Sequence, residues 1–98
     1  MTNSINAREL FLFTTNDGTL YENRVLPIIK NLQKHVDKGT FDKNKSLILW
    51  KNLANDAAKK YAKEFAQYNE WDAIFSIHDR KLVALKLAEY YEDHLENA

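Results

Sequence analysis

The three histidines, His35, His78 and His94, are the side chains of this 98-residue chain best suited to bind a metal or to transfer protons. None has a second histidine three or four residues away, so no helix would present two imidazoles on one face. His78 and His94 each adjoin an aspartate, but neighbouring residues of a helix point to different faces. We therefore expect no metal and no cofactor.

Nucleophilic and phosphate-binding patterns are equally weak. Ser4, Ser46 and Ser76 lie outside any nucleophile-elbow sequence, and the chain has neither a cysteine nor a glycine-rich phosphate loop. Residues 16–19 (Asn-Asp-Gly-Thr) faintly resemble a calcium loop, but its alternating oxygen ligands and closing glutamate are missing. We expect the protein not to be an enzyme.

Lysine side chains form the clearest charged pattern. The net charge is zero, yet residues 24–63 carry +7 and residues 64–98 carry −5. The candidates for binding an anionic partner surround an expected turn at Gly39: Lys30, Lys34, Lys38, Lys43 and Lys45. The alternative, which we favour for most of the basic side chains, is a solvated face that pairs with the acidic last helix when the bundle closes. Arginine is scarce here, which argues against sequence-specific DNA recognition.

Aromatic side chains form a second candidate surface. Five Phe, five Tyr and two Trp are more than a core of this size normally needs. The candidates for a protein interface are Tyr68, Trp71 and Phe75, before the last helix, and Tyr90 and Tyr91 within it. Tyr90 and Tyr91 are adjacent, so at most one points straight at the core. The alternative is that these residues lie at the edge of the core.

The candidate side chains named above are expected to lie on or between helices. With two glycines and one proline, the chain favours few turns and an all-α fold. Apolar spacing predicts a compact bundle of three long helices, at about 19–37, 43–67 and 77–96, plus a short helix at 5–15 and an apolar connector at 71–75. The inward face of the helix at 19–37 is expected at Val25, Ile28, Ile29, Leu32 and Val36, and that of the helix at 43–67 at Leu47, Trp50, Ala54, Ala57, Tyr61 and Phe65. The short segment also fits a buried strand, but no second strand candidate could pair with it. We expect a single helical domain over residues 1–98.

Several residues are expected to end or interrupt these helices. Gly39 is a candidate left-handed cap, Asp42 a candidate N-cap, and Ser76 with Asp79 a candidate capping box. Residues 16–18 predict a turn, with Asp17 or Thr19 as the N-cap of the next helix and Gly18 in a conformation that other residues tolerate poorly. Pro27 fits either a kink within one helix or the first turn of a new helix.

No apolar stretch is long enough to cross a bilayer. The longest continuous apolar runs, Leu10–Phe13 and Leu47–Trp50, have four residues each. The N-terminal residues lack the apolar region of a signal peptide, and the absence of cysteine fits a reducing compartment. We expect a cytoplasmic protein without a membrane partner.

Several segments, taken in order, resemble a group of small uncharacterised proteins from bacteriophages and prophages. The shared pattern is E-L-x-L, N-D-G-x-L-Y, P-I-I-K-N-L, K-G-x-[FY]-D and A-K-K-Y-A-K-E, found here at 9–12, 16–21, 27–32, 38–42 and 58–64. A closing helix, first basic and then acidic, follows. The resemblance implies a small accessory protein in an infected bacterial cell, and it implies no catalytic residue.

Together these observations predict a non-enzymatic phage accessory protein that binds a host or phage protein. Self-association into a homo-oligomer is a further option. The alternative is a weak nucleic-acid-binding protein, without sequence specificity, that uses the lysine-rich turn between the second and third helices.

Overall fold

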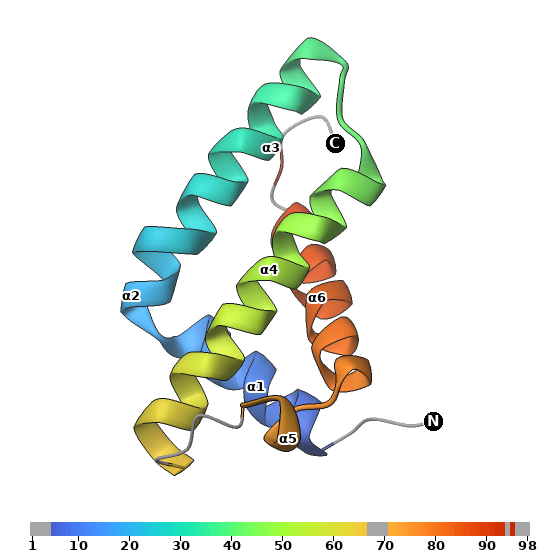
Figure 1. Cartoon of the computed structure of the whole chain (residues 1–98). Coiled ribbons are helices and arrows are strands. Elements are labelled where there is room, and N and C mark those ends of the chain that lie inside the picture. The colour runs from blue at the N-terminus through green and yellow to red at the C-terminus, as the bar shows by residue number, and fades with distance from the viewer. Residues whose placement is uncertain (1–4, 67–70, 94, 96–98) are drawn as a thin grey trace.

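Helices account for nearly all of the chain that the computed structural model describes, which is residues 5–66, 71–93 and 95 (Figure 1). No strand occurs in this part, so the predicted all-α class is confirmed. In order, the elements are α1 (Ile5–Asn16), α2 (Gly18–Leu20), the π-helical turn η1 (Tyr21–Val25), α3 (Leu26–Lys38), α4 (Lys43–Tyr61), a second π-helical turn η2 (Ala62–Ala66), α5 (Trp71–Ile74) and α6 (Ile77–Glu92). None of these helices is both long and apolar enough to cross a membrane.

The predicted boundaries hold except near the end of the chain. The short first helix is α1, and the helix predicted at 19–37 is the continuous run of α2, η1 and α3. The helix predicted at 43–67 is α4 with η2, and residue 67 lies outside the described residues. The segment 71–75, predicted as a connector, contains the short helix α5, and α6 ends at Glu92 rather than at 96.

Three predicted helix ends are confirmed. The carboxylate of Asp42 accepts hydrogen bonds from the backbone N–H groups of Asn44 (2.9 Å) and Lys45 (3.3 Å) at the start of α4. Ser76 and Asp79 form a reciprocal capping box at the start of α6. Gly39 ends α3 in the left-handed conformation, with φ 72° and ψ 21°.

Pro27 lies in the first turn of α3, directly after η1. Proline has no N–H, and in a regular α-helix its ring would press on the carbonyl group four residues earlier. Here the N–H of Leu26 donates to the carbonyl oxygen of Tyr21, five residues back, so the helix is widened just before the proline. Each sequence interpretation is therefore partly right, because the helical path is continuous and Pro27 begins a new α-helical segment within it.

The prediction for Gly18 is wrong. Gly39 is the glycine with positive φ, whereas Gly18 is the first residue of α2, and no atom lies within 4 Å of the position that its Cβ would take. The turn is made by Asp17 instead. Its backbone is extended (φ −82°, ψ 112°), and its carboxylate accepts the N–H of Leu20 at 2.9 Å. Asp17 is therefore the N-cap of α2, and the turn depends on its polar side chain and not on the flexibility of Gly18.

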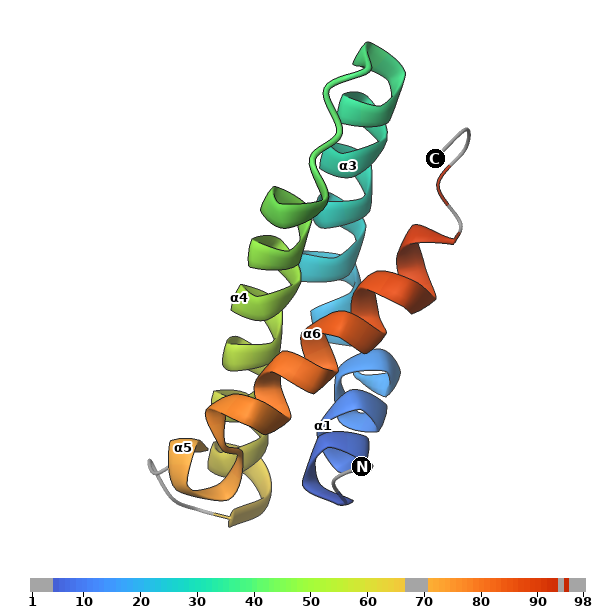
Figure 2. The same cartoon turned by 90° about the vertical axis from the view of Figure 1, so that its right-hand side faces the viewer.

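The core is centred on α4, which packs closely against α6 and α1. Figure 2 shows α6 running diagonally across α4 and α1. Small side chains on both helices let the α4 and α6 backbones approach each other. The buried alanines are Ala54, Ala57 and Ala58 on α4, Ala62 at the start of η2, and Ala84 and Ala88 on α6.

Phe65 departs from the predicted inward face of the third helix. Trp50, Ala54 and Ala57 are buried as predicted, but the side chain of Phe65 is 64% exposed. Phe65 still lies on the same side of the helix as Tyr61, since both rings contact Phe13, but it is in the π-helical turn η2 after α4, where most of its ring stays uncovered.

The helix α3 stands apart from this core and runs beside α4 up to the loop at Gly39 (Figures 1 and 2). Its predicted inward face is confirmed: Val25, Ile28 and Leu32 are buried, and Ile29 and Val36 are partly buried against the core. The molecule measures 43 × 31 × 18 Å, which is about two helices thick. A helix at its margin is therefore covered on one side only.

We expect alanine at the two glycines to change the free energy of unfolding in opposite directions. Gly18→Ala fits a helical backbone with open space around Cβ, and it should stabilise by up to ~1 kcal/mol by restricting the unfolded chain. Gly39→Ala, at φ 72°, should destabilise by ~1 kcal/mol. Urea unfolding of both variants measures the difference, and a matching loss at both positions would contradict the helical conformation of Gly18.

We expect Asp17 to stabilise the fold only above acidic pH. Its pKa is lowered, first because its carboxylate accepts the Leu20 N–H and next because it accepts hydrogen bonds from Lys60 Nζ at 2.9 Å. A carboxyl group with a lowered folded pKa adds stability above its unfolded pKa, and that stability is lost as the pH falls through the folded value.

The variant Asp17→Asn keeps a good N-cap and removes the charge. It should be less stable than the parent by up to ~1 kcal/mol at neutral pH. The difference should shrink as the pH falls below the ordinary carboxyl value of 3.8. Urea unfolding across this pH range tests it, and a difference independent of pH would count against the ion pair with Lys60.

Candidate functional site

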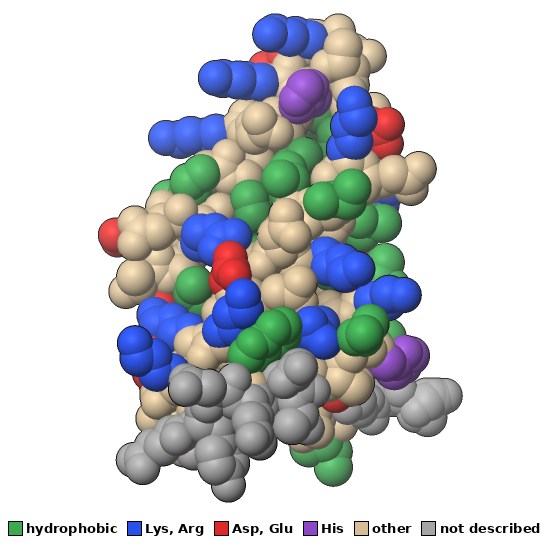
Figure 3. Space-filling view, viewed as in Figure 1, with side chains coloured by type: hydrophobic (Ala, Val, Ile, Leu, Met, Phe, Trp, Pro, Cys, Tyr) green, Lys and Arg blue, Asp and Glu red, His purple; other side chains and the backbone are tan. Residues whose placement is uncertain are grey.

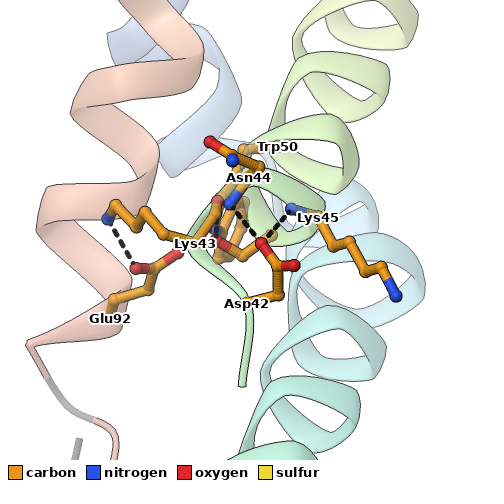
Figure 4. Close-up of polar contacts among 7 residues, drawn as sticks. Asp42, Lys43, Asn44, Lys45, Trp50 and Glu92 are labelled. Carbon is orange, nitrogen blue, oxygen red and sulfur yellow. Dashed lines mark hydrogen bonds and ion pairs between the residues drawn. The ribbon is translucent and has the colours of Figure 1, made fainter. Parts of the chain in front are cut away.

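The five candidate lysines do not form one cluster. Lys30, Lys34 and Lys38 follow α3 at four-residue spacing and are exposed. Figure 3 shows basic side chains standing along this outer edge of the molecule. Lys43 and Lys45, at the start of α4, point in opposite directions, Lys43 toward α6 and Lys45 toward α3 (Figure 4).

Lys43 belongs to a structural contact between α4 and α6. Glu92, whose side chain is 11% exposed, accepts hydrogen bonds from Lys43 Nζ and from Trp50 Nε1, each at 2.8 Å (Figure 4). Trp50 is fully buried, and its ring stacks on that of Tyr91 with the centroids 5.5 Å apart. The expected pairing with the last helix is therefore confirmed for Lys43.

The other four candidate lysines are exposed, as a solvated face requires, but the expected pairing with the last helix is not found in the described part of the chain. Lys30, Lys34, Lys38 and Lys45 form no ion pair with any described residue, whereas Arg24 pairs with Asp56, and Lys60 pairs with Asp17 and Glu64. Among the acidic side chains of α6, Glu92 meets Lys43 at the start of α4, and Asp79 takes part in the capping box at the other end of the helix. Positive charge thus remains uncompensated along α3 and on the adjoining turn.

An open groove separates α3 from α4. Two hollows of about 280 Å³ and 330 Å³ both have Asn31 and Leu49 in their linings, so they form one continuous depression. Its floor is apolar, and Figure 3 shows hydrophobic side chains between α3 and α4 with basic ones on either side. The apolar lining residues are Pro27, Ile28, Leu32, Phe41 and Leu49.

Three of the four titratable groups in the groove wall have local partners, and Lys45 is the exception among the described residues. Asp42 caps α4, and His35 Nδ1 lies 2.8 Å from Thr40 Oγ1. At the other end, Arg24 reaches across to Asp56 of α4. The groove is therefore a shaped apolar surface with a basic rim, and its polar groups serve mainly to hold its walls.

Sequence reasoning missed the groove residues Asn31, Phe41 and Leu49, although one signal for them was present. Four consecutive apolar residues, Leu47–Trp50, cover a full turn of a helix, so they cannot all face the same core. In the structure Trp50 is buried, Leu49 lines the groove, and Ile48 is 57% exposed. This run marks α4 as a helix with more than one apolar face.

The candidate aromatic residues are not brought together. Phe75 and Tyr91 are 1% and 6% exposed, so their assignment to a protein interface is corrected: both fill the core. Trp71 lies against two cations, 5.1 Å from Lys59 Nζ and 4.4 Å from the guanidinium of Arg80. Tyr90 is 53% exposed and makes an edge-on contact with Phe11. Tyr68 lies outside the described residues.

Trp71 and Tyr90 are near opposite ends of α6, which at ~1.5 Å per residue is more than 20 Å long. They are therefore two separate positions on the surface. As predicted for Tyr90 and Tyr91, one ring points at the core and the other does not.

Arg80 is a buried residue that the sequence analysis did not single out. Its side chain donates to Asn55 Oδ1 (3.0 Å) and to the backbone carbonyl oxygens of Phe75 (3.2 Å) and Ser76 (3.3 Å). It joins the turn before α6 to the middle of α4. Like Lys43, it has a structural role.

Comparisons of the chain with models of protein families, with curated proteins and with solved structures find no match. Within the described residues, no group of three His, Asp or Glu side chains could hold a metal ion. The groove between α3 and α4 therefore becomes the candidate site on its own geometry.

We expect Glu92→Ala to destabilise the protein much more than Lys43→Gln. The first change leaves the buried Trp50 Nε1–H without its acceptor, which should lower the free energy of unfolding by ~2 kcal/mol. The second removes only an ion pair whose lysine is 56% exposed, and should lower it by less than ~1 kcal/mol. Thermal and urea unfolding measure both, and equal effects would show that the ion pair dominates the contact.

Proposed function

We propose that this chain is a non-enzymatic phage accessory protein that acts in infected bacteria by binding a host or phage protein. The groove between α3 and α4 is its binding surface. The observation that carries this proposal is the combination of a groove in which Pro27, Phe41 and Leu49 remain at least partly exposed with lysines that have no acidic partner among the described residues. The phage setting rests on the sequence resemblance alone.

The shape of the groove favours a protein over a small molecule. The depression is long and open, and its walls come from two helices that are not tightly packed on each other. Small-molecule sites usually enclose most of the ligand, whereas helix pairs with an apolar groove are a common way to bind a segment of another protein. A second copy of this chain is one candidate partner.

The alternative is weak nucleic-acid binding without sequence specificity. The lysines at four-residue spacing along α3 favour it, since a row of exposed cations attracts any polyanion. A phosphate backbone carries no apolar group that could pack against the apolar residues of the groove. For that reason we put protein binding first.

We expect the groove lysines, and not lysines in general, to hold the partner. The groove variant combines Lys34→Gln, Lys38→Gln and Lys45→Gln. The control variant combines Lys51→Gln, Lys63→Gln and Lys81→Gln, which are equally exposed and lie outside the groove. Three rim charges at up to ~1 kcal/mol each should weaken binding about tenfold or more.

The measurement is capture by the tagged full-length chain from a lysate of phage-infected bacteria, with and without nuclease. A bound protein that resists nuclease, persists with the control variant and falls with the groove variant supports the proposal. Binding that nuclease abolishes would favour the alternative. Equal capture by both variants would remove the groove from consideration.

A further inference from the structure

The groove between α3 and α4 has the length of a site for one short helix. Arg24, paired with Asp56, lies at one end, and Thr40 and Phe41 lie at the other. The helical wall from Arg24 of η1 to His35 of α3 is about 16 Å long at ~1.5 Å per residue, or about three helical turns. A longer helix could pass beyond these ends, but only about three turns would contact the floor.

The lining of the groove combines apolar side chains with side-chain amides. Ile28 and Leu32 come from successive turns of α3 and are buried, so the apolar residues that remain accessible are Pro27, Phe41 and Leu49. Side chains placed at i, i+3 or i+4, and i+7 of a docked helix match the interval between such turns. Amides supply donors and acceptors along the same walls: Asn23, Asn31 and Asn52.

The rim of the groove is positive on both sides. Lys34 and Lys38 each lie three residues beyond a groove-lining residue, Asn31 and His35, so they stand next to that row on α3. Lys45 lines the groove from α4, and all three are exposed without an ion pair to a described residue. The carboxylate of Asp42 in this wall is taken up by capping α4.

We propose that the occupant of the groove is an acidic amphipathic helix of a protein partner, about three turns long in its contact. This inference rests on the proposed function and names the chemistry of the partner. The apolar face of the helix covers the accessible parts of Pro27, Phe41 and Leu49, and carboxylates on its flanks meet Lys34 and Lys38 on one side and Lys45 on the other. Charge complementarity of this kind speeds association and weakens as salt screens it.

The test is a selection from a displayed library of helix-forming peptides of about 16 residues, enough for three to four turns, with every position on the exposed faces randomised. The bait is the full-length chain. The expected product is a consensus with apolar residues at i, i+3 or i+4, and i+7, flanked by Asp or Glu. A parallel selection uses a charge-reversed bait, Lys34→Glu with Lys38→Glu and Lys45→Glu, and should enrich Lys and Arg at the flanking positions instead.

Binding of the selected peptides is then measured by fluorescence anisotropy and placed by NMR. Affinity for the groove variant defined above should fall about tenfold or more, and affinity for the control variant should stay unchanged. Backbone amide shifts should change in α3 and the facing half of α4, and not in α1 or α6. Circular dichroism of each variant confirms that it is folded before its binding is compared.

Three outcomes overturn the inference. The first is a selection that yields no binder, or binders without the acidic flanks or the apolar spacing. The second is a peptide whose NMR shifts fall outside the groove. The third is a groove occupied by something else, seen as concentration-dependent self-association in sedimentation or as a single-stranded oligonucleotide that displaces the peptide and binds more tightly.

The capture experiment distinguishes failure of this inference from failure of the proposed function. If the peptide test fails but nuclease-resistant capture still depends on the groove lysines, the proposed function stands and the partner has another chemistry. If neither experiment shows a protein bound at the groove, both are overturned.

Discussion

The burial of Trp50 between α4 and α6 is the contact on which the rest of the arrangement depends. Its ring is fully buried and stacks on Tyr91, and its Nε1–H must have an acceptor, which Glu92 supplies. These contacts place the end of α6 beside the start of α4, and Lys43 closes the same contact from outside. Buried alanines then bring the two helices close together, and α1 packs against both.

This packing leaves α3 on the margin. One side of α4 packs on α6 and α1, and Leu49 lies toward α3, which contributes only a single narrow stripe to the core. The two helices therefore enclose a groove with Leu49 on one wall and Ile28 and Leu32 on the other. Ile28 and Leu32 are buried within the chain, so the apolar residues that a partner could still cover are Pro27, Phe41 and Leu49.

The distribution of charge follows from the same packing. Glu92 lies where the end of α6 meets the start of α4, so Lys43 pairs with its carboxylate, whereas Lys45, two residues later, points the other way. The lysines of α3 form no ion pair with a described residue. The groove thus combines exposed lysines with apolar side chains that are partly accessible, and the two together define the chemistry of a matching partner.

The sequence by itself determined the helical class, the caps and the inward stripe of α3, because these depend on residues a few positions apart. Asp42, Gly39 and the Ser76–Asp79 box act within one turn of their own helices, so local chemistry suffices to find them. The prediction for Gly18 was wrong, because the side chain of Asp17 caps α2 and the turn does not need a flexible glycine. Only the tertiary structure decided that Phe75 and Tyr91 are buried, which lysines are paired, and that a groove exists between α3 and α4. Each of these depends on how helices distant in the chain pack, and an amphipathic pattern specifies that a face is buried without specifying which helix buries it.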